Sequence, residues 1–182
     1  MEKKNTFWTE MARPVVVLVV ICLVAAALLG FTNAKTAPAI AAAEEEAARQ
    51  LRQAVLPDAT EFADLTKDKL SDELAAMGVT GIYEGDNGTG YVVTAQANGY
   101  GGAVVVTVGF DTDGKILRVE ANVSTETQGV GSKVGVQENM LEKFVGLSGD
   151  VSGVQLKSGA TLTSNAVRNG VNAACAAVAA IQ

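Results

Sequence analysis

The residues best suited to chemistry in this chain are small and hydroxyl-bearing, and they cluster in the sequence SGATLTS, directly before an Ala-rich stretch. Thr163 or Ser164 is predicted to cap a final helix, because a side-chain oxygen at the cap accepts a hydrogen bond from a free backbone N–H. Gly159 allows a tight turn, and Ala160 leaves the approach uncluttered. Thr161 would then lie just ahead of the helix, where free N–H groups and the helix dipole favour a phosphate. An ordinary capping loop explains the same residues, so both interpretations stay open.

A second candidate segment has the sequence STETQGVGSKV and contains Glu126, Thr127, Gly129 and Gly131. Two glycines beside hydroxyl groups suggest backbone that lies against a flat or charged ligand. A flexible connection between a strand and a helix is the alternative interpretation. The segment is not a dinucleotide-binding fingerprint, because no third glycine follows at the required spacing before a helix.

The composition argues against several other kinds of site. The chain of 182 residues has no His and two Cys, which cannot supply the four ligands of a zinc site. Its net charge of −6 argues against nucleic acid as a partner, and its aromatic content of 5% argues against a stacking platform for bases. Cys22 and Cys175 both lie in apolar stretches and are interpreted as small buried hydrophobic residues. No catalytic cluster and no metal site are expected.

The elements that must position these residues can be predicted from the hydrophobic pattern. Apolar residues with helical spacing predict a packed final helix over residues 163–182. They are Val167, Val171, Ala174, Cys175, Val178 and Ile181. Residues 134–149 are predicted to form a short helix that ends at a glycine. β-branched runs separated by Gly-containing turns predict an antiparallel meander from Tyr91 to Val123. The expected fold class is α+β, with an antiparallel sheet packed with helices.

One transmembrane helix is predicted before this domain. Residues 14–34 contain no charged side chain, and about 20 apolar residues suffice to cross the hydrocarbon core as a helix. Pro14 suits the helix start, where its missing N–H costs little. Phe7 and Trp8 suit an interfacial aromatic belt. A cleaved signal peptide, with a cleavage site near Ala34, is the alternative interpretation.

The basic residues that flank this segment predict its orientation. Lys3, Lys4 and Arg13 precede the apolar run, whereas Lys35 alone follows it closely. Because Lys and Arg are enriched on the cytoplasmic side, the N-terminus is predicted to be cytoplasmic and the remainder extracytoplasmic.

A helical stalk is predicted after the span. From Ala39 to Val55 the Ala, Glu, Arg and Gln content is strongly helical, and Pro57 ends the pattern. The predicted organisation has four parts: a cytoplasmic N-terminus over 1–13, a transmembrane helix over 14–34, a stalk over 35–57 and an extracytoplasmic domain over 58–182.

Two motifs of this chain resemble those of a known family. The sequence SGATLTSNAV resembles the flavinylation motif of FMN-binding domains, in which a flavin transferase joins FMN through its phosphate to a Thr hydroxyl. The stretch from Asn98 to Val134 resembles the same family's pattern GYGGPI…DGKI…ETPGLG. With one N-terminal anchor, the chain is similar to the G-subunit family of Rnf electron-transport complexes, which are ferredoxin:NAD oxidoreductases. The resemblance spans most of residues 78–182 and implies that 58–182 is an FMN-binding domain.

The resemblance implies a role for each matching residue. The acceptor of covalent FMN falls on Thr161, and the rest of its motif falls on Ser158, Gly159, Ala160 and Thr163. The second motif, which lies near the flavin in the family, falls on Glu126, Thr127, Gly129 and Gly131. Ser124 stands where His is common and Gln128 where Pro is usual, which affects the expected flavin contacts and leaves the acceptor untouched.

The function implied is that of an electron-transfer subunit that is not catalytic alone. It would relay electrons through covalent FMN in a Rnf-type complex coupled to Na⁺ or H⁺ translocation. The implied partners are other integral membrane and iron–sulfur or flavin subunits, together with a flavin transferase for maturation. The alternatives are the C subunit of a Na⁺-translocating NADH:quinone reductase, a stand-alone extracytoplasmic flavoprotein and a non-redox membrane-tethered domain.

Overall fold

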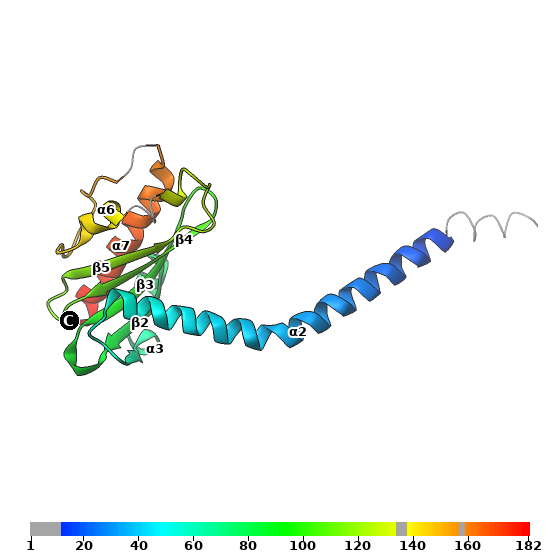
Figure 1. The fold of residues 1–182 in the computed structure, drawn as a ribbon, viewed down its shortest axis with the longest axis horizontal. Coiled ribbons are helices and arrows are strands. Elements are labelled where there is room, and N and C mark those ends of the chain that lie inside the picture. The colour runs from blue at the N-terminus through cyan, green and yellow to red at the C-terminus, as the bar shows by residue number, and fades with distance from the viewer. Residues whose placement is uncertain (1–11, 134–137, 157–158) are drawn as a thin grey trace, which may run out of the picture. The chain divides into compact units, whose positions relative to one another are not determined.

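The computed structural model describes residues 12–133, 138–156 and 159–182, which Figure 1 draws as a ribbon. The chain forms two compact units, Met1–Ala47 and Ala48–Gln182. Four residues used in the membrane prediction lie outside the described residues. They are Lys3, Lys4, Phe7 and Trp8.

The first unit is helical and is formed by most of α2, Arg13–Val55, whose last residues belong to the second unit. Large apolar side chains are exposed along it from Val15 to Phe31. Among the described residues, α2 is the one helix long and apolar enough to cross a membrane, and the chain is therefore membrane-anchored. The helix continues through Pro38, so the predicted span and stalk are one element. It ends at Val55, two residues before Pro57, as the sequence predicts.

The second unit is built on a five-stranded sheet in which every strand pairs antiparallel with its neighbour in sequence. The strands are β1 (Phe62–Asp64), β2 (Val79–Gly85), β3 (Tyr91–Asn98), β4 (Ala103–Phe110) and β5 (Ile116–Asn122). In the centre of the sheet Val93 lies opposite Val108, which lies opposite Val119. The predicted meander from Tyr91 to Val123 is confirmed.

Glycine-containing turns join the central strands. Between β3 and β4, the Gly99 N–H donates to the Gly102 carbonyl oxygen over 2.8 Å. Between β4 and β5, Gly114 adopts a φ of +75°, and its N–H donates to the Asp111 carbonyl oxygen over 3.2 Å. Glycine adopts this left-handed conformation without steric cost, which explains the predicted Asp-Gly turn at this position.

Short helices and one long helix complete the second unit. They are α3 (Thr66–Lys69), α4 (Asp72–Ala76), the 3₁₀ turn η2 (Asp86–Gly88), α6 (Glu138–Leu141), the 3₁₀ turn η3 (Glu142–Phe144) and α7 (Thr161–Ile181). The predicted helix over 134–149 corresponds to α6 and η3, and it ends at Phe144 rather than at Gly149. Residues 134–137 lie outside the described residues. The predicted final helix is confirmed, although it begins two residues earlier than expected.

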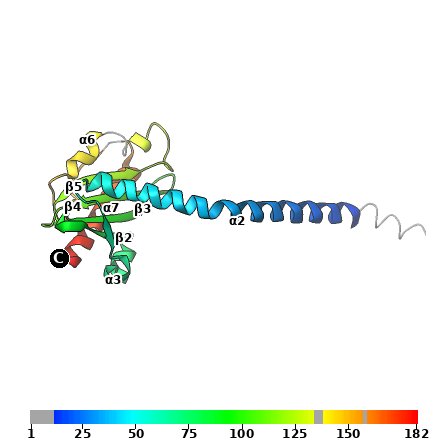
Figure 2. The same ribbon diagram turned by 60° about the horizontal axis from the view of Figure 1, so that its bottom comes forward.

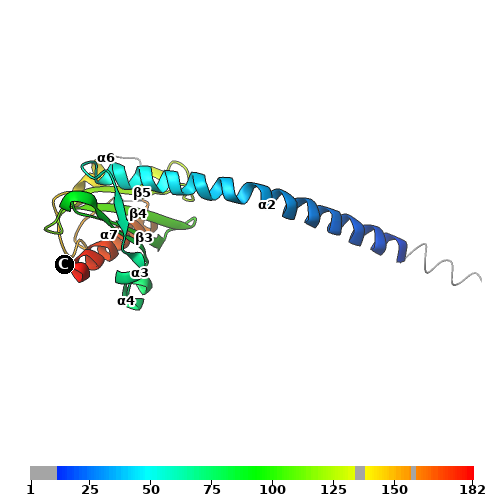
Figure 3. The same cartoon turned by 90° about the horizontal axis from the view of Figure 1, so that it is seen from below.

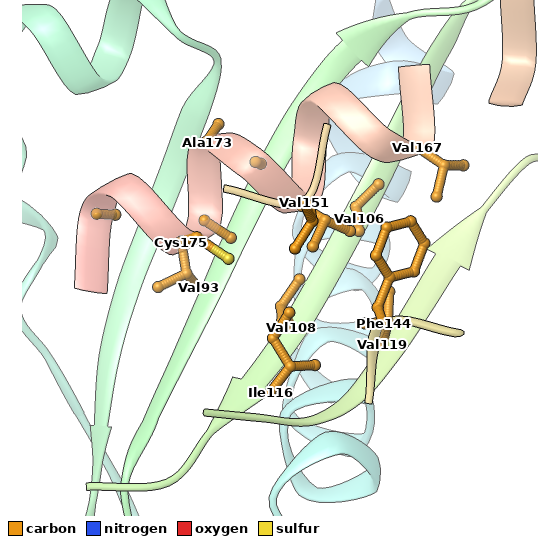
Figure 4. Packing of buried hydrophobic residues seen from close by; sticks show 14 of the residues in the cluster. Val93, Val106, Val108, Ile116, Val119, Phe144, Val151, Val167, Ala173 and Cys175 are labelled. Carbon is orange, nitrogen blue, oxygen red and sulfur yellow. The ribbon is translucent and has the colours of Figure 1, made fainter. Parts of the chain in front are cut away.

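α7 covers one face of the sheet, over β2, β3 and β4 (Figures 2 and 3). Alternate strand residues such as Val93, Val106 and Val108 point toward α7 and are fully buried. The apolar face of α7 contributes Val167 and Cys175 to the same core (Figure 4). The helix approaches closely at Gly170, where an added Cβ atom would lie 2.9 Å from Val106 Cγ2. This packing fixes the position of the middle of α7 relative to the sheet.

A smaller apolar cluster covers part of the other face of the sheet. It consists of Val55, Leu56, Ala59 and Val92, all at most 1% exposed. Gly109 makes this contact possible, because a Cβ atom there would collide with the carbonyl oxygen of Val55. The end of α2 and the residues after it are therefore part of the folded domain.

Candidate functional site

A pocket of about 320 Å³ lies where three segments of the second unit meet. The β3–β4 loop contributes Tyr100, the loop after β5 contributes four residues between Glu126 and Gly131, and the start of α7 with the residues before it contributes residues 159–163. In Figure 1 these segments are the green, yellow-green and orange loops at one end of the sheet. The volume is at the lower end of the range of small-molecule sites, which is about 300–1,000 Å³. Its lining consists of Tyr100, Glu126, Thr127, Val130, Gly131, Gly159, Ala160, Thr161, Leu162 and Thr163.

The start of α7 differs from the predicted cap. The cap residue is Ala160, whose side chain makes no hydrogen bond, and Thr161 is the first residue of the helix. Thr163 and Ser164 lie inside the first turn and are buried, so the prediction that one of them caps the helix was wrong. Their burial has a physical reason, since the helix extends to the pocket and the Thr163 hydroxyl has a partner there.

Thr161 is the exposed hydroxyl of this turn. Gly159, two residues before it, has a φ of +92°, a conformation that favours glycine. Apart from its neighbours in the sequence, no described residue has an atom within 4 Å of the position that a Cβ atom would occupy at Gly159. Ser158 lies outside the described residues.

A buried hydrogen bond joins the two predicted motifs. The Thr163 hydroxyl donates to Glu126 Oε2 over 2.6 Å, and the two residues are 2% and 4% exposed. The other carboxylate oxygen, Oε1, accepts from the Gly101 N–H over 3.1 Å. Both oxygens of Glu126 therefore have donors from this chain, and the carboxylate connects the β3–β4 loop to the start of α7. A negative charge near a helix N-terminus is favourable.

Glycines around Glu126 allow this close packing. At Gly131 a Cβ atom would lie 2.7 Å from Glu126 Oε2 and 2.8 Å from Thr163 Oγ1. At Gly99 a Cβ atom would collide with Glu126 Oε1. The glycines of the two loops are therefore required by contact with the Glu126–Thr163 pair, which is a reason that spacing in the sequence does not reveal.

The loop after β5 forms a compact turn. Gly129 has a φ of +81°, and its N–H donates to the Ser132 hydroxyl over 2.9 Å. The Ser132 N–H in turn donates to the Thr127 carbonyl oxygen over 3.3 Å. Thr127 and Gly131 line the pocket, whereas Gly129 does not. The structure thus brings all the described predicted site residues except Gly129 to the pocket.

Three pocket residues were not predicted from the sequence. Tyr100, Val130 and Leu162 line the pocket and are 73%, 48% and 56% exposed. We call them the apolar rim. Each lies beside a motif residue in the sequence, and this adjacency is the signal that could have identified them. Large exposed apolar side chains around a pocket suit a ligand with a flat apolar part.

Both cysteines are free, and neither lines this pocket. Cys175 is 5% exposed in the core, as predicted, whereas Cys22 is exposed along α2. Burial, assisted by the negative charge of Asp150, raises the pKa of Cys175 to about 11. Cys175 is therefore a protonated core thiol at neutral pH. Within the described residues, no group of three or more His, Cys, Asp or Glu side chains could hold a metal ion.

Comparison with known proteins gives a consistent result. The model of the FMN-binding domain family matches residues 99–176. The chain is 32% identical to the G subunit of the Na⁺-translocating ferredoxin:NAD⁺ oxidoreductase complex of Acetobacterium woodii, over 94% of this chain and 93% of that protein. It is 28% identical to the G subunit of the ion-translocating oxidoreductase complex of Methanosarcina acetivorans, over 91% and 93% of the two chains. It is 26% identical to the G subunit of the proton-translocating ferredoxin:NAD⁺ oxidoreductase complex of Clostridium ljungdahlii, over 86% and 85%.

Proposed function

Because the chain belongs to the G-subunit family of ion-translocating, Rnf-type ferredoxin:NAD⁺ oxidoreductase complexes, we propose that it relays electrons in such a complex through an FMN joined to Thr161. It is a flavoprotein subunit of an oxidoreductase complex and is not catalytic alone. The observation that carries the attachment site is the exposed Thr161 hydroxyl at the start of a 21-residue helix, on the edge of the pocket.

The residues at this position fit the phosphate of FMN. Thr161 begins α7, and the first N–H groups of a helix favour an anion beside them. The open space at Gly159 leaves room for a phosphate. The helix dipole would then stabilise the negative charge of the phosphodiester.

Exposure favours Thr161 over Thr163 as the acceptor. A separate flavin transferase must reach the hydroxyl, and Thr163 is 2% exposed with its hydroxyl donating to Glu126. Thr161 is exposed at the pocket edge. Of the two hydroxyls, only the one on Thr161 is open to another protein.

The proposed attachment balances without a change in oxidation state. A bond would form between Thr161 Oγ1 and the FMN phosphorus of a flavin dinucleotide, and the pyrophosphate bond would break. The hydroxyl would lose its proton, and a nucleoside monophosphate would leave. The bound flavin then supplies one- and two-electron chemistry, which the side chains of this chain do not provide.

The residues around the pocket would orient the flavin. The apolar rim of Tyr100, Val130 and Leu162 offers contact to a flat ring system. Thr127 and Gly131 also line the pocket and would contribute polar backbone groups to it. Together with the covalent bond, these groups would hold the flavin at the surface, where another protein of the complex can exchange electrons with it.

We further propose that the flavin domain lies outside the cytoplasm. The support is the larger number of Lys and Arg residues before the apolar run than directly after it. A covalent bond would prevent loss of a cofactor that is not easily replaced in that compartment. The proposed partners are the other integral membrane and iron–sulfur or flavin subunits of the complex, with a flavin transferase for maturation. A single apolar span carries no charge for an ion path, so other subunits would translocate Na⁺ or H⁺.

The experiment that tests this function is intact mass and in-gel fluorescence of the denatured full chain, expressed with an active flavin transferase. A fluorescent band supports the proposal if the mass of the chain has increased by that of FMN less one water and the addition maps to the Thr161 peptide. Thr161→Val should abolish both signals while the protein still folds. A dark band of unmodified mass, with a transferase active on another substrate, would rule out covalent flavin.

A further inference from the structure

We propose that Glu126 and Thr163 are positioning residues that hold the Thr161 hydroxyl in the geometry needed for flavin attachment. The inference rests on the proposed function above. It assigns to these two residues a mechanical connection to the acceptor rather than contact with the flavin.

The first observation is that each carboxylate oxygen of Glu126 accepts a hydrogen bond from this chain. One carboxylate oxygen of Glu126 accepts from the Thr163 hydroxyl over 2.6 Å, and the other accepts from the Gly101 N–H over 3.1 Å. Both side chains are buried at 4% exposure or less. Hydrogen bonds to a charged acceptor are stronger than neutral ones, so this connection resists disruption.

The second observation is the position of Thr163 relative to the acceptor. Thr161 and Thr163 lie in the same first turn of α7, so fixing one in a helix fixes the backbone of the other. The cap residue Ala160 makes no side-chain hydrogen bond that would hold this turn. Gly159, directly before it, has the conformational freedom of glycine. The Glu126–Thr163 hydrogen bond therefore adds a buried polar connection to the start of a helix whose cap residue makes no side-chain hydrogen bond.

The third observation is that Glu126 is also hydrogen-bonded to the β3–β4 loop. Gly101 lies on the β3–β4 loop, so its hydrogen bond connects the carboxylate to the central hairpin of the sheet. Gly99 and Gly131 pack against the carboxylate so closely that a Cβ atom at either would collide with it. The connection thus runs from the sheet, through Glu126, to the turn that carries Thr161.

A carboxylate beside a hydroxyl also resembles a general base beside its nucleophile, and burial distinguishes the two roles. The hydroxyl that Glu126 contacts belongs to Thr163, which is 2% exposed and closed to a transferase. If Glu126 acts only by positioning the turn, flavin attachment should not require its charge, provided that its two hydrogen bonds are kept. Gln at this position can accept from the Gly101 N–H and donate to the Thr163 hydroxyl, which can also act as an acceptor.

The test is the rate of flavin incorporation into the full chain, purified in detergent without flavin. The chain is mixed with purified flavin transferase and flavin dinucleotide, and gel fluorescence is followed while the chain concentration is varied. Thr163→Val and Glu126→Ala should lower kcat about 100-fold, as for a misplacement of about 1 Å, with little change in KM. Thr163→Ser and Glu126→Gln should restore most of the lost rate, because they keep the hydrogen bonds.

A matched control removes a hydroxyl hydrogen bond away from the pocket. Thr66 Oγ1 accepts from the Ile82 N–H over 3.0 Å, at the junction of α3 and β2. Thr66→Val should lower the thermal midpoint without lowering kcat. If Thr163→Val does not fold, Glu126→Asp serves instead, since its shorter side chain keeps the charge and should still lower kcat.

Each other outcome overturns the inference. Equal kcat for Thr163→Val and Thr66→Val would mean that the pair only stabilises the fold. If Glu126→Gln were as slow as Glu126→Ala, charge would matter rather than position. A wild-type chain that is flavinylated normally while the variants keep full kcat would refute the inference alone. A wild-type chain that takes up no flavin would refute the proposed function as well.

Discussion

Thr161 and Thr163 lie two positions apart in the first turn of α7, yet one hydroxyl is exposed and the other is buried against Glu126 over 2.6 Å. The sequence places both in one motif and does not distinguish them. In the folded chain the first is open to another protein, and the second connects the helix to the loops beneath it. This difference in exposure is the basis of the roles proposed above for the two residues.

Thr161→Ser should keep covalent flavin, because the hydroxyl that forms the phosphoester is retained. The substitution lies at an exposed position, so the free energy of unfolding should change by no more than about 0.5 kcal/mol. Intact mass after co-expression with the transferase measures attachment, and chemical denaturation measures stability. An unmodified, fully folded Ser variant would contradict the assignment of a simple hydroxyl acceptor.

Gly131→Ala should destabilise the domain, because its Cβ atom would lie 2.7 Å from Glu126 Oε2 and 2.8 Å from Thr163 Oγ1. Overpacking of this kind costs about 1–3 kcal/mol of unfolding free energy. The matched control is Gly153→Ala, since nothing lies within 4 Å of a Cβ atom there. Chemical denaturation compares the two variants, and equal stabilities would show that the loop can move away from the pair.

Acid should weaken the contact between Asp86 and Thr60. The Thr60 hydroxyl and N–H donate to the Asp86 carboxylate over 2.6 and 2.9 Å, and these hydrogen bonds lower the pKa of Asp86 below 3.8. A lowered folded-state pKa means that the stabilisation is present above 3.8 and is lost as pH falls through the folded value. The thermal midpoint should decrease as pH falls, and this decrease should be smaller in Asp86→Asn and in Thr60→Val than in the wild type. An unchanged pH profile in both variants would contradict this.

Cys175 should not react with alkylating reagents at neutral pH while the chain is folded. Its pKa of about 11 and its burial leave little thiolate and little access. The Cys22→Ala variant leaves Cys175 as the one thiol in the chain, so mass spectrometry after alkylation reports on it alone. The reaction should proceed after denaturation. Rapid alkylation of the folded variant would mean that α7 separates from the sheet.

Much of the fold could be predicted because its signals are local. Alternating β-branched residues and the Asp113-Gly114 turn predict β3, β4 and β5, and helical spacing from Val167 onward predicts α7. The family expectation was also confirmed. Strands β1 and β2 both lie before the predicted meander, which begins at Tyr91.

The candidate site could be predicted only in part, because its central contact is not local. Glu126 and Thr163 are 37 positions apart, and neither flanking sequence reveals the other. Thr163 has a side chain typical of a helix cap, yet the tertiary contact places it inside the helix and leaves Ala160 at the cap. The role of each residue toward the flavin and the orientation in the membrane remain predictions.

The order of the strands has a consequence for the maturation of the chain. Each strand pairs with the one before it in sequence, so the sheet can form progressively as the chain is synthesised. α7 follows every strand, and five of the ten pocket residues lie between Gly159 and Thr163. Thr161, the proposed acceptor, therefore reaches its final surroundings only after the strands have assembled. Flavin attachment would then mark a finished molecule, and unfolded or truncated chains would remain colourless.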